Sequence, residues 1–240
     1  MAERELSVSE LRDLYRRYER ALLDLGFTRF ERRLGTDDWQ RLMCKVKEQW
    51  DPEVNINPAL EADANPEINQ ATGLCIIGYV GDEAVAGVCA RSYPNVTNFA
   101  RWLEKGRMWA PPHRAVECDW EPVDPQFDIK GHLVQVGGLF IRKGVVKRGG
   151  AKFLARMMRI AVVLGWETPP VDHIIGLLSD STYRRFPEGN AGCKPVGIVA
   201  RGLAIGCPPT DFWLTHAEAQ EGLMLDGYEH DNPSDTAVVV

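Results

Sequence analysis

The stretch FIRKGVVKRGGAKFLARM, residues 140–157, links the apolar segment HLVQVGGLFI (132–141) to a run of apolar residues at helical spacing. The pattern of 132–141 predicts a buried strand, and the helical spacing that follows predicts the start of a helix. A basic loop with glycines lies between them. The first N–H groups of a helix have no intrahelical partner, and the helix dipole is positive there, so a helix N-terminus binds anions. A strand, a glycine loop and a helix in this order therefore predict a phosphate site.

Charge is distributed unevenly along the chain. The formal net charge is −6, yet the window from Ile129 to Trp166 contains no acidic residue. It contains eight basic residues, which are Lys130, Arg142, Lys143, Lys147, Arg148, Lys152, Arg156 and Arg159. An acidic protein with such a window is expected to have a local anion site. The alternative is a solvated basic helix face.

Two common phosphate motifs do not fit this loop. A Walker loop needs Lys and then Ser or Thr after its last glycine, because the hydroxyl binds Mg²⁺. Here Gly149 is followed by Gly150, Ala151 and Lys152, so that hydroxyl is missing. The G-x-G-x-x-G spacing of dinucleotide-binding folds is absent as well. Successive backbone N–H groups of the loop can instead bind a pyrophosphate without a metal.

The flanking segments predict a mixed α/β domain. Ser7 and Glu10 have the spacing of a capping box, Gly26 follows the first helix, and Thr36 precedes a second one. Gly137 and Gly138 indicate a bulge or a close backbone approach in the strand 132–141. The other expected elements are a hairpin (74–80 and 84–91), strands at 27–34, 171–178, 194–200 and 210–216, and a short helix in STYRRF (181–186). Such an order indicates a mixed sheet flanked by helices.

Composition is that of an ordinary globular protein, with 45% hydrophobic and 26% charged residues. No apolar run has the length of a membrane span, and the charged N-terminus does not have the pattern of a secretory signal. The six cysteines have no metal-ligand spacing. We therefore expect reduced thiols, no metal site, no membrane contact and a cytoplasmic location.

The loop and its surroundings resemble the GCN5-related N-acetyltransferase (GNAT) superfamily. That family binds acyl-coenzyme A with a strand and a loop of the form Q/R-x-x-G-x-G/A that opens a helix. Residues 146–151 match at the glycine and at the Gly/Ala position, whereas Val146 stands where the family has Gln or Arg. The order of elements across residues 27–216 agrees with the family too.

The resemblance implies an α/β (α+β) fold with a mixed, splayed sheet flanked by helices and an extra N-terminal helix. Residues 1–26 would be a helical extension and 27–216 the acyl-CoA N-acyltransferase-like domain. Within that domain 92–130 would be an irregular insertion. Residues 217–240 would form a C-terminal helix or tail.

The resemblance also implies how acetyl-CoA, the co-substrate, would bind. The strand 132–141 would splay from the strand 171–178, and the pantetheine arm would lie between them. Backbone groups near Leu139 and Ile141 would bond the arm, and the N–H groups from Lys147 to Lys152 would hold the pyrophosphate. The implied coenzyme-binding residues are Leu139, Ile141, Lys147, Arg148, Gly149, Gly150, Ala151 and Lys152.

Acyl transfer to an amine needs a deprotonated nucleophile, a polarised thioester carbonyl and a proton for the departing thiolate. In the family a Tyr on the helix after the fifth strand often donates that proton. Tyr183 occupies such a helix, and the alternative is an aromatic residue packed under the sheet. The candidates for the general base are Glu117, Asp119, Asp128 and His132, each of which could instead be a solvated or capping residue. Gln135 could orient a water or be a satisfied core amide.

The function implied by the resemblance is transfer of an acetyl or other acyl group from coenzyme A to a primary amine. Three tryptophans and several carboxylates in 92–130 would suit a cationic amine, and packing of a long loop is the alternative. A second hypothesis is a non-catalytic GNAT-like component of a larger assembly, such as a virion, because Val146 departs from the motif. An acidic chain whose basic residues are not regularly interleaved with aromatic ones does not favour nucleic-acid binding.

Overall fold

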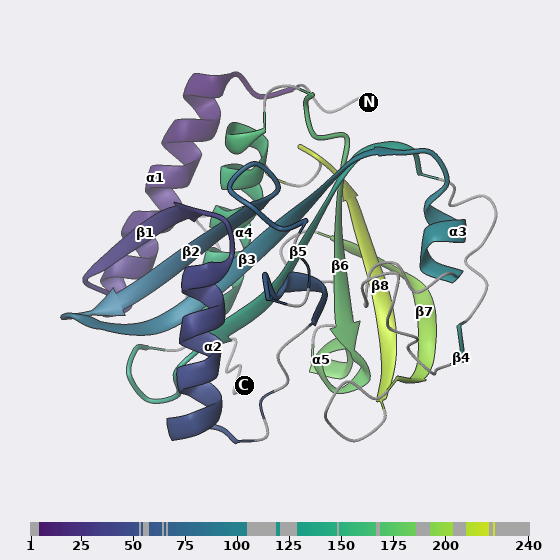
Figure 1. Cartoon of the computed structure of the whole chain (residues 1–240). Helices are drawn as coiled ribbons and strands as arrows, with labels where there is room; N and C mark the ends of the chain where they lie inside the picture. The colour runs from purple at the N-terminus through teal and green to yellow at the C-terminus, as the bar shows by residue number, and fades with distance from the viewer. Residues whose placement is uncertain are drawn as a thin grey trace.

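A mixed sheet of eight strands forms the centre of the molecule, in the spatial order β1-β2-β3-β5-β6-β8-β7-β4 (Figure 1). The computed structural model describes residues 5–52, 54, 58–63, 65, 67–104, 119–120, 129–147, 149–166, 169–185, 193–203, 210–220 and 223. The strands are β1 (Arg29–Leu34), β2 (Gly73–Val80), β3 (Glu83–Val96), β4 (Asp119–Trp120), β5 (Gly131–Ile141), β6 (His173–Ser179), β7 (Lys194–Leu203) and β8 (Thr210–Glu218). Neighbouring strands run antiparallel except β5 and β6, which run parallel.

Helices lie on both faces of this sheet (Figure 1). They are α1 (Val8–Asp24), α2 (Asp37–Gln49), the 3-10 helix η1 (Pro58–Leu60), α3 (Phe99–Glu104), α4 (Gly150–Gly165) and α5 (Asp180–Arg185). Along β2, Leu74 and Ile76 belong to the apolar cluster of α1 and α4, whereas Cys75 and Ile77 belong to that of α2 and η1. Side chains of a strand alternate between faces, so these helix pairs cover opposite faces. The predicted mixed sheet flanked by helices, with an extra N-terminal helix, is confirmed.

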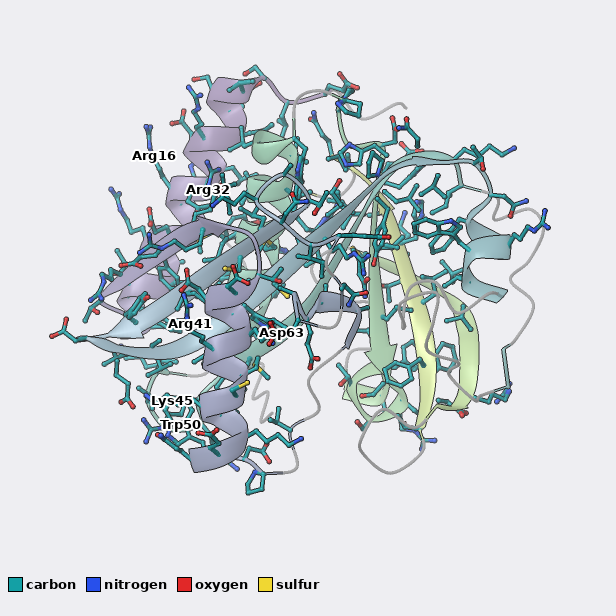
Figure 2. All side chains as sticks on the ribbon, in the orientation of Figure 1. Arg16, Arg32, Arg41, Lys45, Trp50 and Asp63 are labelled. Carbon is teal, nitrogen blue, oxygen red and sulfur yellow. The ribbon has the colours of Figure 1, made fainter. Side chains whose placement is uncertain are left out.

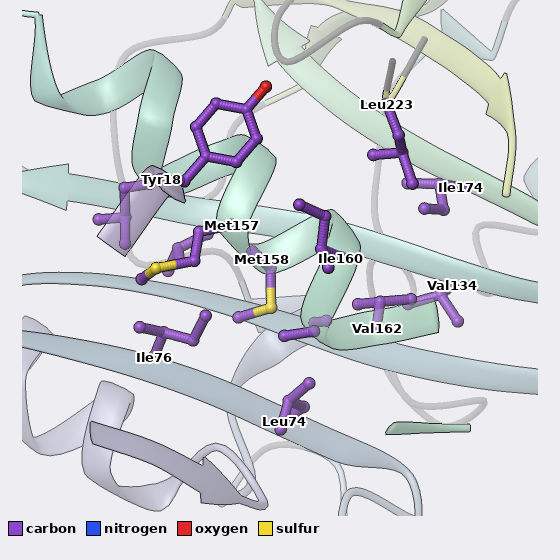
Figure 3. Packing of buried hydrophobic residues seen from close by; sticks show 14 of the residues in the cluster. Tyr18, Leu74, Ile76, Val134, Met157, Met158, Ile160, Val162, Ile174 and Leu223 are labelled. Carbon is purple, nitrogen blue, oxygen red and sulfur yellow. The ribbon is translucent and has the colours of Figure 1, made fainter. Parts of the chain in front are cut away.

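The largest apolar cluster joins α4 to α1 and to the strands beneath it. Figure 3 shows Met157 and Met158 of α4 between Tyr18 of α1 and the strand residues Leu74 and Ile76. All five side chains are buried. The helix predicted as an N-terminal extension therefore shares the main core, which apolar burial stabilises.

Most of the helix ends and turns predicted from the sequence are present in the structure. The Ser7 hydroxyl accepts from the Glu10 N–H (3.3 Å), and the Glu10 carboxylate accepts from the Ser7 N–H (2.8 Å). Gly26, with φ +114°, follows the end of α1. The predicted β2–β3 hairpin is confirmed, with one shift of register between Gly78 and Tyr79. Thr36 precedes α2 as predicted, but it makes no side-chain cap hydrogen bond.

Residues 92–104, the described start of the segment 92–130, are more regular than predicted. Residues 92–96 continue β3, which pairs with β5 through Tyr93–Leu133 and Val96–Gly131. The register shifts between those two pairs, and Asn95 has φ +61°, so the Pro-Asn dipeptide forms a bulge without ending the strand. The helix α3 follows, and Trp102 lies edge-to-face on Tyr93 with ring centroids 5.0 Å apart.

Cys75 and Cys89 face each other across the β2–β3 hairpin as free, buried thiols. Burial raises the pKa of Cys75 to about 12, so this thiol stays protonated at neutral pH. Cys44 and Cys193 are free as well. Within the described ranges, none of the helices combines the length and apolar character that crossing a membrane requires.

Candidate functional site

The strands β5 and β6 pair over three residues and then separate. Their ladder consists of Leu133–His173, Val134–Ile174 and Gln135–Ile175, although β5 continues to Ile141 and β6 to Ser179. Burial changes at the same point, because residues 132–135 and 174–176 are buried while 136–141 and 177–179 are half-buried. Figure 1 shows the two strands spreading toward their C-terminal ends. The predicted splay is confirmed, and we call residues 136–141 the open edge of β5.

Ile141 directs its backbone groups toward this open edge. The Arg142 N–H donates to the Val85 carbonyl (2.8 Å), and Phe140 pairs with β3, so both residues face β3. Successive residues of a strand direct their N–H and C=O groups to opposite edges. The N–H and C=O of Ile141 therefore point to the side that β6 has left, whereas Leu139 lies beside the bulge at Gly138, where this alternation is interrupted.

A bulge interrupts the open edge, as predicted. The register between β3 and β5 shifts opposite Gly138, which has φ +60°. Trp39 of α2 is fully buried and donates its indole N–H to the Gly138 carbonyl at 2.7 Å. The bulge is thus held from one face by a side chain of α2.

The loop after β5 leads directly into the N-terminus of α4. Gly149 is the N-cap residue, with φ +100° and ψ −9°, a conformation that glycine adopts without a side-chain clash. The first N–H groups of a helix have no intrahelical acceptor, and in α4 the first of them belong to Gly150 and Ala151. The first turn carries no acidic residue. The backbone arrangement that an anion requires is therefore present.

Lys147 does not contribute its N–H to this arrangement, contrary to the prediction. Its N–H donates to the Leu25 carbonyl (2.9 Å), and its ammonium lies 3.4 Å from the Asp24 carbonyl oxygen. Carbonyls at a helix C-terminus lack intrahelical partners, so the end of α1 accepts these groups. The prediction that the cradle begins at the Lys147 N–H is wrong, because that N–H ties the loop to α1. Arg148 lies outside the described residues.

The basic residues of the window do not form one patch. Arg142 donates to Glu83 (3.0 Å), and its guanidinium lies 4.3 Å from the centre of the Trp50 ring. Lys45 binds the same carboxylate (3.0 Å) and the same ring (4.6 Å). Figure 2 shows Lys45 and Trp50 together at the C-terminal end of α2. Arg159 is fully buried in α4, so the charge near the glycine loop is smaller than the sequence suggests.

Tyr183 lies on α5, at the end of β6 where the two strands separate. Its half-buried ring stacks on Trp213 of β8, with centroids 3.7 Å apart and planes 13° apart. The Trp213 indole N–H donates to Asp180 (3.2 Å). The structure thus brings Tyr183 to the same edge of the sheet as the glycine loop. It also gives the ring a packing contact, which was the alternative interpretation.

His132 lies at the other end of β5 and is 3% exposed. Its Nδ1 is 2.9 Å from the Pro169 carbonyl and its Nε2 is 2.7 Å from the Ser92 hydroxyl. A carbonyl only accepts, so Nδ1 donates to it, and in the neutral imidazole Nε2 accepts from the hydroxyl. Both ring nitrogens are therefore engaged in the fold. At about 3.3 Å per residue, His132 is about 23 Å from Leu139 along the strand.

The other base candidates are not brought to the open edge by any described contact. Asp119, of which only the backbone is described, belongs to β4 and pairs with β7. Two strands lie between β4 and β6, which places β4 about 14 Å from β6 at about 4.8 Å per strand. Glu117 and Asp128 lie outside the described residues. In the described part of the chain, no three His, Cys, Asp or Glu side chains are grouped to hold a metal.

Tyr93 is a polar residue near the strand separation that sequence reasoning did not single out. Its hydroxyl donates to the Gln135 side-chain oxygen at 2.8 Å, and the two residues are 4% and 1% exposed. Gln135 forms the last rung of the β5–β6 ladder. No signal in the sequence identifies this pair, because it depends on the register between β3 and β5.

Comparison with known proteins finds similarity in structure only. No family model matches the chain, and no curated protein matches it in sequence. Similar solved structures include Arabidopsis thaliana NAA60 in complex with acetyl-CoA, with a TM-score of 0.45, 15% identity, and coverage of 79% of this chain and 98% of that chain. An N-acetyltransferase from Staphylococcus aureus Mu50 has a TM-score of 0.45 and 11% identity, with 80% and 99% of the two chains covered. The apo form of a mutant agmatine N-acetyltransferase has a TM-score of 0.47 and 12% identity, with 79% and 100% covered.

Proposed function

We propose that this chain is an acyl-CoA-dependent N-acyltransferase, which transfers an acetyl or other acyl group from coenzyme A to a primary amine. The observation that carries the proposal is the early end of the β5–β6 ladder at Gln135–Ile175, beside the N-terminus of α4. A pantetheine arm can pair with the N–H and C=O groups of Leu139 and Ile141, in the place that β6 leaves. Its pyrophosphate then meets the first N–H groups of α4.

The reaction follows from this placement. The amine nitrogen attacks the thioester carbonyl carbon, the C–N bond forms, and the C–S bond breaks. The nitrogen loses one proton and the coenzyme sulfur gains one. Holding both reactants in one geometry lowers the barrier, and Tyr183 at the end of β6 would supply the proton for the sulfur.

Titration calorimetry with acetyl-CoA tests the coenzyme site. We expect the native protein to bind, and Gly149→Val to weaken binding about tenfold or more, because a branched side chain distorts the N–H groups at a residue with φ +100°. Gly81→Val is the matched control. Gly81 also has positive φ (+59°) and open space around a Cβ, but it lies in the β2–β3 turn. Absence of binding by the native protein, or equal affinity in all three, would contradict the proposal.

Tyr183→Phe tests the proton donor. Turnover of acetyl-CoA with an amine such as agmatine should fall about 100-fold, because general acid catalysis typically contributes at least that factor. The dissociation constant of acetyl-CoA should stay nearly unchanged. Tyr183→Leu, which also removes the stacking on Trp213, serves as the comparison. If Tyr183→Phe turns over like the native protein and Tyr183→Leu unfolds more easily, Tyr183 is a packing residue only.

The second candidate function is a non-catalytic component of a larger assembly. Val146, at the position where the superfamily has Gln or Arg, is half-buried and packs against the core cluster that contains α1. A packing residue at this point favours a loop held for structural reasons. Binding of acetyl-CoA without turnover across a panel of amines, and without hydrolysis, would support this alternative.

A further inference from the structure

The side-chain carboxamide of Gln135 lies between two apolar clusters. Leu133, two residues before it on the same face of β5, belongs to the cluster that includes α3. Gly137, two residues after it, lies under Leu60 of η1, since a Cβ there would be 3.1 Å from the Leu60 side chain. Gln135 itself is 1% exposed. A buried amide is costly unless its polar atoms are hydrogen-bonded, so its presence here requires a reason.

The oxygen of this carboxamide is occupied by Tyr93. The Tyr93 hydroxyl donates to Oε1 at 2.8 Å, and burial raises the pKa of Tyr93 to about 12, so the phenol keeps its proton. Arg91 holds Tyr93 in turn. Its guanidinium lies 4.7 Å from the centre of the ring, and it donates to the Ala59 carbonyl (2.9 Å) and to Asn65 (3.2 Å).

The side-chain nitrogen of Gln135 is the second polar atom of the carboxamide. Among the described residues, Nε2 of Gln135 has no hydrogen-bond partner. Nε2 carries two N–H donors and no acceptor, so it can be satisfied only by an oxygen or another acceptor atom. An arm that starts at the α4 N-terminus and pairs with Ile141 and Leu139 runs back along β5 toward Gln135. Its thioester end therefore comes nearest to the last rung of the ladder, where this donor lies.

We propose that Gln135 is a catalytic residue whose Nε2 donates a hydrogen bond to the carbonyl oxygen of the thioester. The inference rests on the proposed acyl transfer. When the amine nitrogen bonds to the carbonyl carbon, the electron pair of the C=O bond moves to that oxygen, and Nε2–H stabilises the resulting negative charge. When the carbonyl re-forms, the C–S bond breaks and the electron pair leaves with the sulfur. Gln135 gains and loses no proton in these steps.

The chemistry of a carboxamide favours this role over that of a base. A carboxamide does not accept a proton at neutral pH, but preorganised donors of this kind stabilise oxyanions strongly where water is excluded. The hydrogen bond from Tyr93 to Oε1 polarises the amide and strengthens its N–H groups as donors. Tyr93 is thus a positioning residue for Gln135.

Gln135→Glu and Gln135→Leu are the test variants, and Gln49→Glu, at an exposed residue of α2, is the matched control. The assays are transfer from acetyl-CoA to agmatine and hydrolysis of acetyl-CoA without an amine, since both reactions place negative charge on the same thioester carbonyl oxygen. Loss of one such donor typically lowers kcat about 100- to 1000-fold. We expect that loss in both reactions for Gln135→Leu, with the acetyl-CoA dissociation constant within about twofold of the native value. Gln49→Glu should behave like the native protein.

The pH dependence of Gln135→Glu distinguishes a donor from a base. A protonated carboxyl group has an O–H donor and a carboxylate has none. If position 135 must donate, activity of Gln135→Glu rises as pH falls relative to the native profile. If it must accept a proton or orient a water as a base, activity of this variant rises as pH increases, and the proposal is overturned.

The double variant Tyr93→Phe/Gln135→Leu separates function from folding. Replacing both hydrogen-bonded partners by apolar groups is nearly neutral or stabilising, so its unfolding midpoint should equal or exceed the native one while turnover stays low. A clearly lowered midpoint would assign the pair to folding and overturn the inference. Native acetyl-CoA binding with unchanged turnover in Gln135→Leu would overturn this inference alone. Absence of acetyl-CoA binding by the native protein would overturn the proposed function itself.

Discussion

Gly138→Ala is expected to lower the free energy of unfolding by about 3 kcal/mol, through a clash in a packed core and a left-handed backbone. A Cβ at Gly138 would lie 2.6 Å from Cε2 and 2.8 Å from Nε1 of Trp39, and closer still to Cζ2. The Trp39 ring cannot move away from such a Cβ, because Trp39 is fully buried and its indole N–H is bonded to the Gly138 carbonyl. Urea unfolding followed by circular dichroism measures the change.

Gly81→Ala measures the cost of a left-handed alanine without a side-chain clash. Gly81 has φ +59°, almost the same as the +60° of Gly138, but a Cβ there has no atom within 4 Å. We expect this variant to lose only the left-handed contribution, about 1–2 kcal/mol. Equal losses in the two variants would show that α2 does not press on the bulge, and that the open edge of β5 is shaped by the backbone alone.

Trp39→Ala should have the other large effect, about 3–5 kcal/mol, since removal of a buried large aromatic leaves a cavity. Trp39→Phe keeps most of the ring but leaves the buried Gly138 carbonyl without its donor, which we expect to cost about 1–3 kcal/mol. Because the same bond holds the bulge, Trp39→Phe should also weaken acetyl-CoA binding if the arm pairs with the open edge. Unfolding curves and calorimetric titration of the same preparations measure both effects.

Trp166→Phe is the matched control for this hydrogen bond. The Trp166 indole N–H also donates to a backbone carbonyl, that of Ala71, at 2.8 Å. Ala71 is exposed, so water can replace the lost donor and the cost should be well below 1 kcal/mol. A loss for Trp166→Phe as large as that for Trp39→Phe would mean that burial of the carbonyl is not what makes the Trp39 bond important.

Residues close together in the sequence specify the local elements and both halves of the proposed coenzyme site. Apolar periodicity located α1, α2, α4 and the β2–β3 hairpin, and the Ser7–Glu10 capping box and Gly26 marked the ends of α1. Gly149 and Gly150 marked the start of α4, and Gly137 and Gly138 marked the bulge in β5. Such features depend on residues close in sequence, whose backbone preferences and hydrogen bonds are set by their immediate neighbours.

Contacts between polar residues that are distant in the sequence depend on how the strands pair. The Lys147 N–H is bonded to the end of α1, and Arg142 is bound to Glu83 and Trp50, so neither serves the anion site as charge counting suggested. His132 is hydrogen-bonded at the N-terminal end of β5, away from the open edge. Tyr93 and Gln135, in contrast, meet across the β3–β5 register at the last rung of the β5–β6 ladder. Pairing between distant strands sets these contacts, and a shift of one residue would turn each side chain to the other face of the sheet. Local preferences do not encode that register, because it follows from burying both faces of the sheet at once.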